Sequence, residues 1–538
     1  MRKTTKLILP IIIAIAFVAG MLASLVLFQK NTTTINFNHQ NNNKLNTIIN
    51  YIENEYVDDV KLDSIIEITI PKFLKELDPH SFYFNPQDAK EVNEPLEGNF
   101  DGIGVQFNMH KDTLLIIEVI SGGPSENIGI LAGDRIIQVN DSVIAGVSKK
   151  SDDIIKLLKG PRGTKVNVKI LRRGRIELLD FTITRDVIPI KSVDAYNMMS
   201  ETTGYIKISS FSRTTHDEFV QACFILKSKG MQNLILDLRG NSGGYLDAAT
   251  NIVDEFLHGG KLIVYTEGKA RPTRNTYSSD KRNSCIDINL AVLIDEFSAS
   301  ASEVVAGAIQ DNDRGWIVGR RSFGKGLVQE STMFNDGSTL RLTTARYYTP
   351  SGRCIQKNYS KGYENYYDEI AERFIHGEFS EMDSVEYSDT VKYKTSKGRI
   401  VYGGGGIMAD KFIPFDTILF NPAYRLISDY GLSYGFALKY SDENREKFKK
   451  IKSTQGLINQ LDKENTIAKF YAYLKENKIE FTNEDIKDVS ELIKQSVYSY
   501  IIRNIRGESA FYWYVNKYDE TCIEARRILE TKEQLIKN

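Results

Sequence analysis

Apolar positions divide the first part of the chain into segments of different period. Residues 7–28 are apolar apart from one serine and two small breaks, and as a helix rising about 1.5 Å per residue they would cross a bilayer core of about 30 Å. Residues 31–43 are polar and rich in asparagine, without an apolar period, which is typical of a flexible spacer. In residues 45–77 apolar side chains recur at helical spacing, and this pattern predicts a small helical region.

The flanks of the first apolar segment predict its orientation. Arg2, Lys3 and Lys6 precede it, so the positive-inside rule keeps the amino terminus in the cytoplasm and exports everything after Lys30. The alternative is a cleaved signal peptide, but the apolar core is longer than the usual 7–15 residues. We therefore expect residues 1–30 to form an uncleaved transmembrane anchor, followed by a linker over residues 31–44.

The helical region, residues 45–96, contains the stretch LDPHSFYF at residues 77–84. Its Asp-Pro pair marks a turn. His80 invites a catalytic interpretation, but a single histidine beside a turn is more often structural, and we expect a structural role.

Residues 97–186 have a different sequence pattern, which predicts short strands and two helices and contains frequent glycine. Strands are predicted near residues 103–108, 114–120 and 166–174, and a helix over residues 152–160. The pattern predicts a compact α+β module.

In residues 187–420 buried strands alternate with amphipathic helices, which predicts an α/β layer with functional residues at the carboxyl ends of its strands. The expected elements are strands at 203–211, 233–239 and 290–295 and helices at 217–230, 245–257 and 303–310. Two strand ends, at residues 237–244 and 295–302, are expected to converge.

Residues 421–538 are rich in lysine and glutamate and have helical periodicity. One predicted helix face carries Ile486, Val489, Ile493, Val497 and Tyr500. The aromatic run FYWYV is predicted to pack in a helical core, with a binding surface as the alternative. Adaptor binding and formation of a homo-oligomer stay open as functions of this region.

Composition excludes several functional classes. The chain has 69 Lys and Arg residues and 70 Asp and Glu residues, a net charge of −1. It therefore lacks the net positive charge that is typical of nucleic-acid-binding proteins. The four cysteines lack CxxC spacing and the six histidines lack an HExxH pattern, so we expect reduced core cysteines, no metal site and no cofactor.

Two glycine-rich motifs suggest chemistry but lack required partners. GNSGG, with Ser242 at its centre, matches the G-x-S-x-G elbow between a strand and a helix, but only His258 and His376 follow it as candidate bases. Its freed N–H groups at a helix amino terminus suit an oxyanion instead. GRRSFGKG, residues 319–326, is one residue short of a P-loop, and the following segment alternates as a strand.

Ser300 and Lys325 form the favoured pair. Ser300 sits where a strand gives way to a helix, and Lys325 lies between two glycines. A lysine can act as the base for a serine if burial lowers its pKa to about 7–8. The competing interpretation is that Ser300 only caps the helix, since Ser300-x-x-Glu303 is a capping box; both roles are compatible.

Several separated motifs resemble the carboxyl-terminal processing proteases, a family of tail-specific serine endopeptidases with an embedded PDZ domain. Along the chain they are DLRGNSGG (237–244), SASASE (298–303), FGKGLVQ (323–329), YYTPSGR (347–353) and VYGGGG (401–406), which is the order of the family. The resemblance implies Ser300 as nucleophile, Lys325 as general base and Gln329 as the side chain that orients the lysine. It also implies an oxyanion hole made by the backbone N–H groups of Gly243 and Ala301, with Ser242 as scaffold.

Residues 97–186 closely resemble a PDZ domain. Gly102, Ile103, Gly104 and Val105 occupy the carboxylate-binding loop, and AGDRI (132–136) the usual Gly-Asp turn. Such a loop can hold a terminal carboxylate while the next strand pairs with an extended peptide; a turn that merely closes a barrel is the alternative.

The resemblance thus implies a multidomain α/β and α+β protein: anchor, PDZ domain, α/β protease core and a carboxyl-terminal helical region. Its substrates would be proteins or peptides with exposed C-termini, met at a bacterial inner membrane with the catalytic part in the periplasm or cell exterior. A membrane-tethered PDZ scaffold without activity is the alternative function.

Overall fold

The protein is described by a computed structural model over residues 43–109, 112–279, 282–384 and 391–535. No helix in these ranges is long and apolar enough to cross a membrane, and the predicted anchor lies outside them. The chain divides into two compact units, residues 1–70 and 71–538. The first contains α2 (Asn43–Glu55) and the start of α3 (Leu62–Lys75), helices predicted from the apolar period.

The segment predicted as an α+β module folds around an antiparallel sheet in the order β3-β4-β5-β7-β8, with β6 on β5. Its strands are β3 (Val105–Met109), β4 (Leu114–Val119), β5 (Arg135–Val139), β6 (Ser142–Val143), β7 (Lys165–Leu171) and β8 (Leu179–Thr184), and its helices are α5 (Pro124–Asn127) and α6 (Ser151–Leu158). Ile154 and Leu158 of α6 share one apolar core with Ile103. A ribbon of β2 (Asn99–Gly102) and β9 (Asp186–Pro189) forms both chain connections to the rest of the unit.

The core sheet has six strands in the order β10-β11-β12-β15-β16-β21, all parallel except β10. They are β10 (Val193–Met198), β11 (Thr203–Ile208), β12 (Asn233–Asp237), β15 (Asn289–Ile294), β16 (Trp316–Gly319) and β21 (Lys411–Phe412). The apolar runs of β12 and β15 are buried on both faces because helices cover both. The predicted α/β layer is present.

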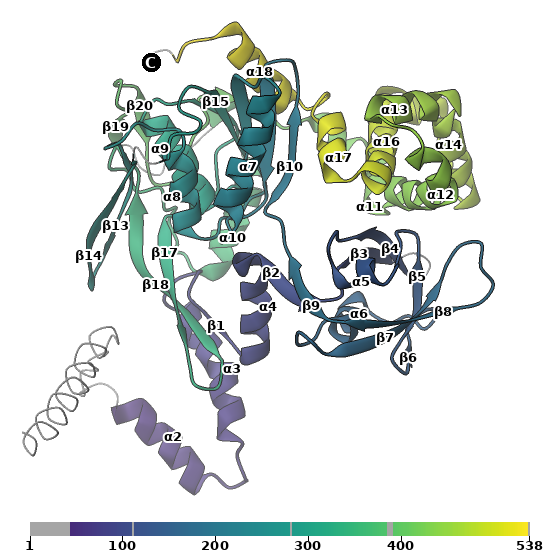
Figure 1. Ribbon diagram of the computed structural model, residues 1–538. Helices are drawn as coiled ribbons and strands as arrows, with labels where there is room; N and C mark the ends of the chain where they lie inside the picture. The colour runs from purple at the N-terminus through teal and green to yellow at the C-terminus, as the bar shows by residue number, and fades with distance from the viewer. Residues whose placement is uncertain (1–42, 110–111, 280–281, 385–390, 536–538) are drawn as a thin grey trace, which may run out of the picture. The chain divides into compact units, whose positions relative to one another are not determined.

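Alternate residues of each strand face different helices. Leu236 and Val292 pack in the cluster of α7 (Thr215–Ser228), α8 (Leu246–Asp254) and α9 (Ala301–Asp311). Ile235 and Leu293 pack on the other face, against α18 (Glu520–Thr531), which Figure 1 shows beside this sheet. The last helix, expected in a separate helical region beginning at residue 421, therefore covers one face of the α/β core sheet.

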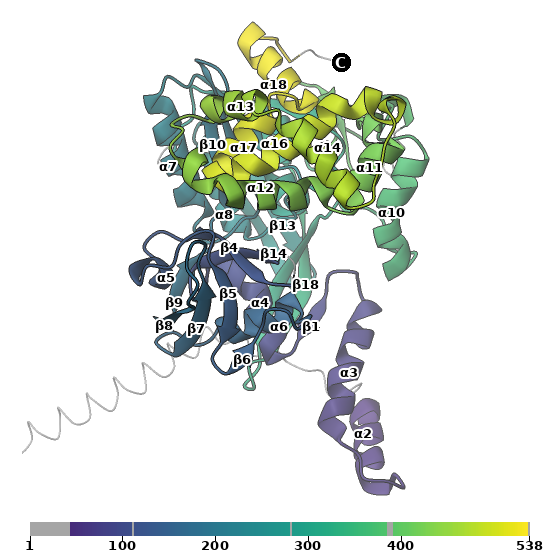
Figure 2. The same ribbon diagram turned by 90° about the vertical axis from the view of Figure 1, so that its right-hand side faces the viewer.

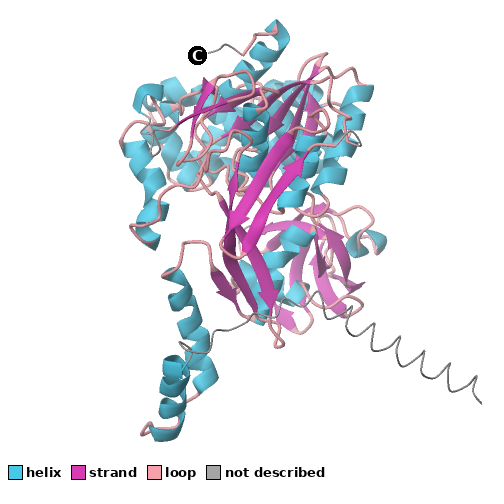
Figure 3. Cartoon of the chain, turned by 90° about the vertical axis from the view of Figure 1, so that its left-hand side faces the viewer, coloured by secondary structure: helices cyan, strands magenta, loops and turns pink. Residues whose placement is uncertain are grey.

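A second, antiparallel sheet carries part of the site. It has the order β1-β18-β13-β14, with β17 also paired to β18. Its strands are β1 (Phe82–Phe84), β13 (Leu262–Gly268), β14 (Arg271–Tyr277), β17 (Leu327–Met333) and β18 (Thr339–Tyr348), seen as magenta arrows in Figure 3. In sequence, α4 (Pro86–Glu97) follows β1 and α10 (Tyr363–Ile375) follows β18, and a small hairpin comes next, β19 (Lys392–Lys394) and β20 (Ile400–Tyr402).

The remaining helices form a bundle with its own apolar core (Figure 2). They are α11 (Pro422–Asp429), α12 (Leu432–Lys449), α13 (Thr454–Lys463), α14 (Thr466–Glu476), α15 (Asn483–Ile486), α16 (Ser490–Arg506) and α17 (Glu508–Val515). The predicted face is confirmed in part: Ile493, Val497 and Tyr500 lie on α16, whereas Ile486 and Val489 precede this helix, and all five residues pack in or against the bundle core. From the aromatic run, Tyr514 is buried in this core and Tyr512 packs against the core sheet, so the run serves packing as predicted.

Candidate active site

The two predicted strand ends meet because β12 and β15 are parallel neighbours, with Asp237 beside Leu293. Their loops are then joined by hydrogen bonds: the Gly240 N–H donates to Asp295 Oδ1 (2.9 Å) and the Ala299 N–H to the Asn241 carbonyl (3.0 Å). The carboxyl ends of parallel strands lie at one edge of a sheet, where sites in α/β folds occur.

This meeting brings Gly243 against Ser300. A Cβ on Gly243 would lie 2.8 Å from Ser300 Cβ and 3.1 Å from Ala301 N, and the backbone φ of Gly243 is +109°. Only glycine fits both the space and the conformation. The structure therefore brings together three of the predicted site residues, from segments more than fifty positions apart.

Ser300 itself precedes α9 with φ +56° and ψ −114°. A non-glycine residue held in such a conformation costs on the order of 1–3 kcal/mol, and the surrounding contacts must maintain it. One such contact is the Ser300 N–H, which donates to Glu303 Oε2 (2.8 Å). The glutamate half of the predicted capping box is thus present, and it fixes the backbone of the nucleophile candidate.

Glu303 also holds the lysine loop. Its carboxylate is fully buried and accepts from Ser322 Oγ (2.6 Å), from the Gly324 N–H (2.7 Å) and from the Lys325 N–H (2.9 Å). Burial raises its pKa to about 7, although these hydrogen bonds oppose the shift. One carboxylate therefore binds the backbone on both sides of the predicted dyad.

Lys325 lies in the loop between β16 and β17. Burial of the ammonium, with a smaller effect of Arg341, lowers its pKa to about 8, while the charges of Glu303 and Asp78 act in the opposite direction. A lysine with this pKa is neutral often enough near pH 8 to accept a proton. A pKa of about 8 meets the condition stated above for a lysine that acts as the base for a serine.

Two further side chains form hydrogen bonds near the site, and only that of Tyr347 reaches the Lys325 loop. Gln329, on β17, donates through Nε2 to Thr343 Oγ1 (3.4 Å). The buried Tyr347 hydroxyl contacts the carbonyl oxygens of both Ser300 (3.1 Å) and Lys325 (2.5 Å). The backbones of the two dyad candidates are therefore linked through Tyr347 as well as through Glu303.

A groove of about 740 Å³ opens at this site. Ser300, Ala301, Gln329 and Tyr347 are among the residues that line it, whereas Lys325 and Gly243 are not. The Gly243 N–H donates to Asn241 Oδ1 (2.8 Å), so in this conformation the predicted oxyanion donor is occupied. The nucleophile candidate therefore lines the groove, whereas the predicted base does not line it and the predicted oxyanion donor at Gly243 is bonded to Asn241.

The competing motifs do not build a site. Ser242 is exposed on the glycine turn, and no hydrogen bond within the described ranges joins it to a histidine. Residues 319–326 lead into strand β17 and not into a helix, so the P-loop is excluded as expected. Among the described residues no cluster of His, Cys, Asp and Glu is arranged to hold a metal ion. All four cysteines are free, three of them buried.

The predicted carboxylate-binding loop of the α+β module directly precedes β3, which is an edge strand of its sheet. Gly104 has φ +75°, and a Cβ there would approach Ile188 and Pro124 to 3.2–3.3 Å. Val105 begins β3, which in the part of the chain that the structure describes pairs only with β4. Its other edge is geometrically suited to an added strand.

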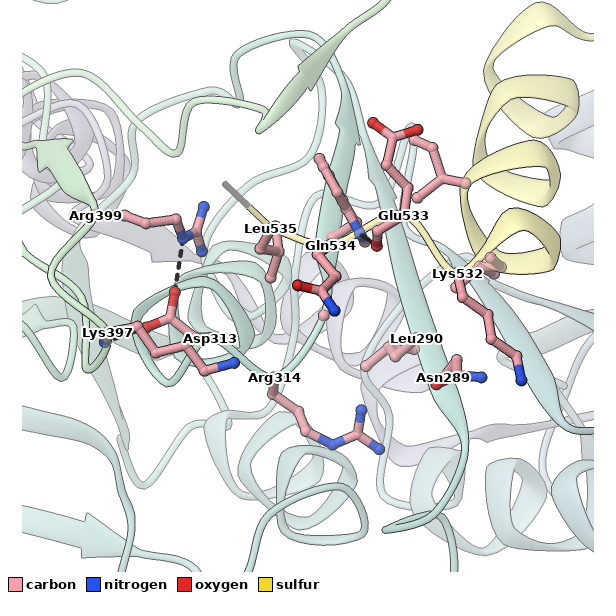
Figure 4. A pocket seen from close by; sticks show the side chains of 14 residues that line it. Asn289, Leu290, Asp313, Arg314, Lys397, Arg399, Lys532, Glu533, Gln534 and Leu535 are labelled. Carbon is pink, nitrogen blue, oxygen red and sulfur yellow. Dashed lines mark hydrogen bonds and ion pairs between the residues drawn. The ribbon is translucent and has the colours of Figure 1, made fainter. Parts of the chain in front are cut away.

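A second cavity, of about 640 Å³, lies at the amino-terminal ends of β15 and β16, opposite the site (Figure 4). Two of its four basic side chains are already engaged: Arg399 pairs with Asp313 (2.6 Å), and Arg314 donates to four backbone carbonyls. This cavity offers no free cationic group from these two arginines.

Sequence reasoning identified Glu303 only as a cap and did not single out Tyr347, Thr343 or Asp78. The S-x-x-E spacing was a usable signal for Glu303, because a carboxylate at that position faces the turn before the helix. The Asp-Pro turn and the YYTPSGR motif contain Asp78 and Tyr347, but no local signal indicates what these residues or Thr343 contact, because their contacts depend on the pairing of β17, β18 and β1.

Comparison with known proteins agrees with this architecture. Residues 202–364 match the model of peptidase family S41, residues 102–183 a PDZ domain, and residues 423–507 a family of unknown function. A carboxy-terminal-processing protease of Bartonella bacilliformis is 36% identical over 355 residues, covering 64% of this chain and 80% of that protein. The carboxy-terminal processing protease CtpA of Bacillus subtilis is 33% identical over 364 residues, covering 66% and 76%.

Among solved structures, a photosystem II D1 C-terminal processing protease is 27% identical, covers 57% of this chain and 87% of its own, and has a TM-score of 0.31. The relative from Bartonella, matched over most of its length, and the two domain models in their expected order identify the family. The chain belongs to peptidase family S41, with the PDZ-containing carboxy-terminal processing proteases.

Proposed function

We propose that the protein is a serine endopeptidase that cleaves by a Ser300–Lys325 dyad and recognises substrate C-termini through its PDZ domain. The observation that carries the proposal is the Glu303 carboxylate, which binds the backbone N–H groups of both Ser300 and Lys325. A structural helix cap requires only the first of these bonds. The lowered pKa of Lys325 provides the matching chemistry.

In the proposed reaction, neutral Lys325 accepts the proton of Ser300 Oγ as that oxygen attacks the scissile carbonyl carbon. The N–H groups of Gly243 and Ala301 stabilise the tetrahedral oxyanion. Lys325 then protonates the leaving amine, and water releases the acyl group by the same steps. Gln329 orients the lysine from β17.

The reaction requires a rearrangement of the present conformation. The Gly243 N–H must leave Asn241 Oδ1, and the Lys325 amine must reach the groove that Ser300 lines. We propose that a peptide carboxylate bound at Gly102 to Val105, with its strand added to β3, favours this change. The β2–β9 ribbon, which carries both connections of the PDZ domain, is the route by which binding acts on the core.

The proposed compartment follows from the apolar segment at residues 7–28 and its basic flank, which would anchor the enzyme and export residues 31–538. Its substrates are then proteins or peptides of the periplasm or cell exterior with accessible C-termini.

The test is cleavage of a protein with an unstructured, apolar C-terminal tail by wild type, Ser300→Ala, Lys325→Ala and Ser242→Ala. We expect the first two variants to be inactive and Ser242→Ala to retain activity. Loss of activity in Ser242→Ala together with an active Ser300→Ala variant would refute the dyad. An inactive wild type that still binds the tail peptide would favour the scaffold.

Deletion of residues 98–185 tests recognition separately. The variant should lose its preference for tailed over tail-blocked substrate, and an unchanged preference would refute PDZ-dependent recognition.

A further inference from the structure

The turn before β1 reaches the active site from the amino-terminal region. Asp78, His80 and Ser81 are all buried, with at most 9% of each exposed. Asp78 organises the turn, because its carboxylate accepts from the N–H groups of His80 (2.7 Å) and Ser81 (2.9 Å) and from Ser81 Oγ (2.6 Å). From α10, the Tyr367 hydroxyl donates to the carbonyl of Pro79 (3.1 Å). The turn is therefore rigidly placed.

Asp78 connects this turn to the far end of the lysine segment. Thr343 Oγ1 donates to Asp78 Oδ1 (3.1 Å) and accepts from Gln329 Nε2 (3.4 Å). The Thr343 N–H also donates to Ser81 Oγ (3.1 Å), so both polar groups of Thr343 are bound by the turn. Through Thr343, Asp78 fixes the side chain that is proposed to orient the lysine.

His80 connects the same turn to the near end of the segment. Its Nε2 lies 2.8 Å from the Tyr366 hydroxyl, which in turn accepts from Gln356 Nε2 (3.3 Å). Gln356 Oε1 accepts from the Gly326 N–H (2.8 Å), immediately after Lys325. The Tyr366 ring also packs edge-on against the ring of Phe323, with 5.7 Å between the ring centroids. Phe323 precedes Lys325 in the sequence, whereas Gly326 follows it.

The hydrogen bonds around Tyr366 are satisfied when His80 carries its proton on Nδ1 and accepts at Nε2. Because Gln356 Oε1 is the acceptor for Gly326, its amide nitrogen faces Tyr366 and must donate. The Tyr366 hydroxyl proton is then free for His80 Nε2, which accepts as part of a neutral imidazole. Burial, together with the charges of Lys325 and Lys357, lowers the pKa of His80 to about 3, in agreement with a neutral ring.

We propose that Asp78 and His80 are positioning residues for the general base, holding the segment 325–329 from its two ends. This inference rests on the proposed Ser300–Lys325 dyad and adds a part of the active site contributed by the amino-terminal region. His80, expected from the sequence to be structural, acts through Tyr366 and Gln356 on the lysine loop.

The pKa of Lys325 depends on the charges around it. A turn that only stabilised the fold would not change this pKa, so the pH profile of activity distinguishes the two roles. Arg341 on β18 favours the neutral amine, whereas Glu303 on α9 and Asp78 in the turn favour the ammonium. The turn also places neutral His80 near Lys325, and Lys357 acts on the same histidine. Replacing Asp78 by Asn removes one stabilising charge and should lower the pKa of the base.

The experiment measures kcat and KM against pH for wild type, Asp78→Asn, His80→Ala and His80→Gln, with melting temperatures. Asp88→Asn, an exposed carboxylate at the start of α4, is the matched control. We expect Asp78→Asn to move the acid limb of kcat/KM to lower pH. His80→Ala should lower kcat by about tenfold to a hundredfold, the size of effect that misplacement of a catalytic group produces.

KM should stay nearly unchanged in His80→Ala, because the turn does not line the groove. His80→Gln should recover part of kcat, since its amide oxygen can accept the Tyr366 proton. Folded Asp78→Asn protein with an unmoved acid limb, or equal activity of folded His80→Ala and wild type, would overturn the inference. Failure of the dyad is distinguishable, because Ser300→Ala would then retain activity.

Discussion

Glu303→Gln tests the link between Ser300 and Lys325 most directly. The glutamine oxygen can replace only one of two carboxylate oxygens, each of which accepts two hydrogen bonds. In the less costly orientation the new NH₂ group faces Ser322 Oγ, which can accept, and the Gly324 N–H, which cannot. One buried backbone donor is then unpaired, at a cost of about 1–3 kcal/mol.

The unpaired Gly324 N–H lies in the loop that contains Lys325, so the substitution destabilises the folded conformation of this loop. If the assembled loop is destabilised by about 1–3 kcal/mol relative to its alternatives, the equilibrium constant for its assembly falls by roughly 5- to 150-fold. We expect kcat for a tailed substrate to fall by up to this factor and the melting temperature to fall by several degrees.

Glu296→Gln is the matched control. Glu296 is a buried carboxylate in the same turn, bonded to Arg320 (2.9 Å) and to neither dyad residue. It should lower the melting temperature without a comparable loss of kcat. Folded Glu303→Gln protein with a kcat within about twofold of wild type would refute the idea that this carboxylate assembles the site.

Three further results are expected. Because the pKa of Lys325 is lowered to about 8 and its neutral form is the base, kcat/KM should rise with pH up to about 8 and then level off, and a profile independent of pH below 8 would contradict a lysine base. Gly243→Ala should lower kcat by about 100-fold or more, as for loss of an oxyanion donor, because its Cβ would meet Ser300 Cβ at 2.8 Å; circular dichroism would show that the variant folds, and full activity would exclude Gly243 from the site. Leu529→Ala should destabilise the protease core by about 2–5 kcal/mol in urea unfolding, and an unchanged core transition would show that α18 is dispensable.

Much of the fold could be predicted from local patterns. Buried strands such as β12 and β15 are short apolar runs bounded by polar turns, and the helices between them have an apolar period of 3.6. The role of α18 could not be predicted in this way. Its apolar face resembles that of the bundle helices, and only packing shows that Cys522, Ala525 and Leu529 cover the core sheet.

The sequence by itself determined the reactive groups: a serine at a strand-to-helix turn, a lysine between glycines, and motifs whose order identifies the family. The tertiary structure decided their environment. The pKa of Lys325 depends on burial and on Arg341, Glu303 and Asp78, which come from three separate segments. The occupied Gly243 N–H is likewise visible only in three dimensions. A local pattern specifies which side chain is present, whereas charge state and donor availability depend on neighbours that folding brings from distant parts of the chain.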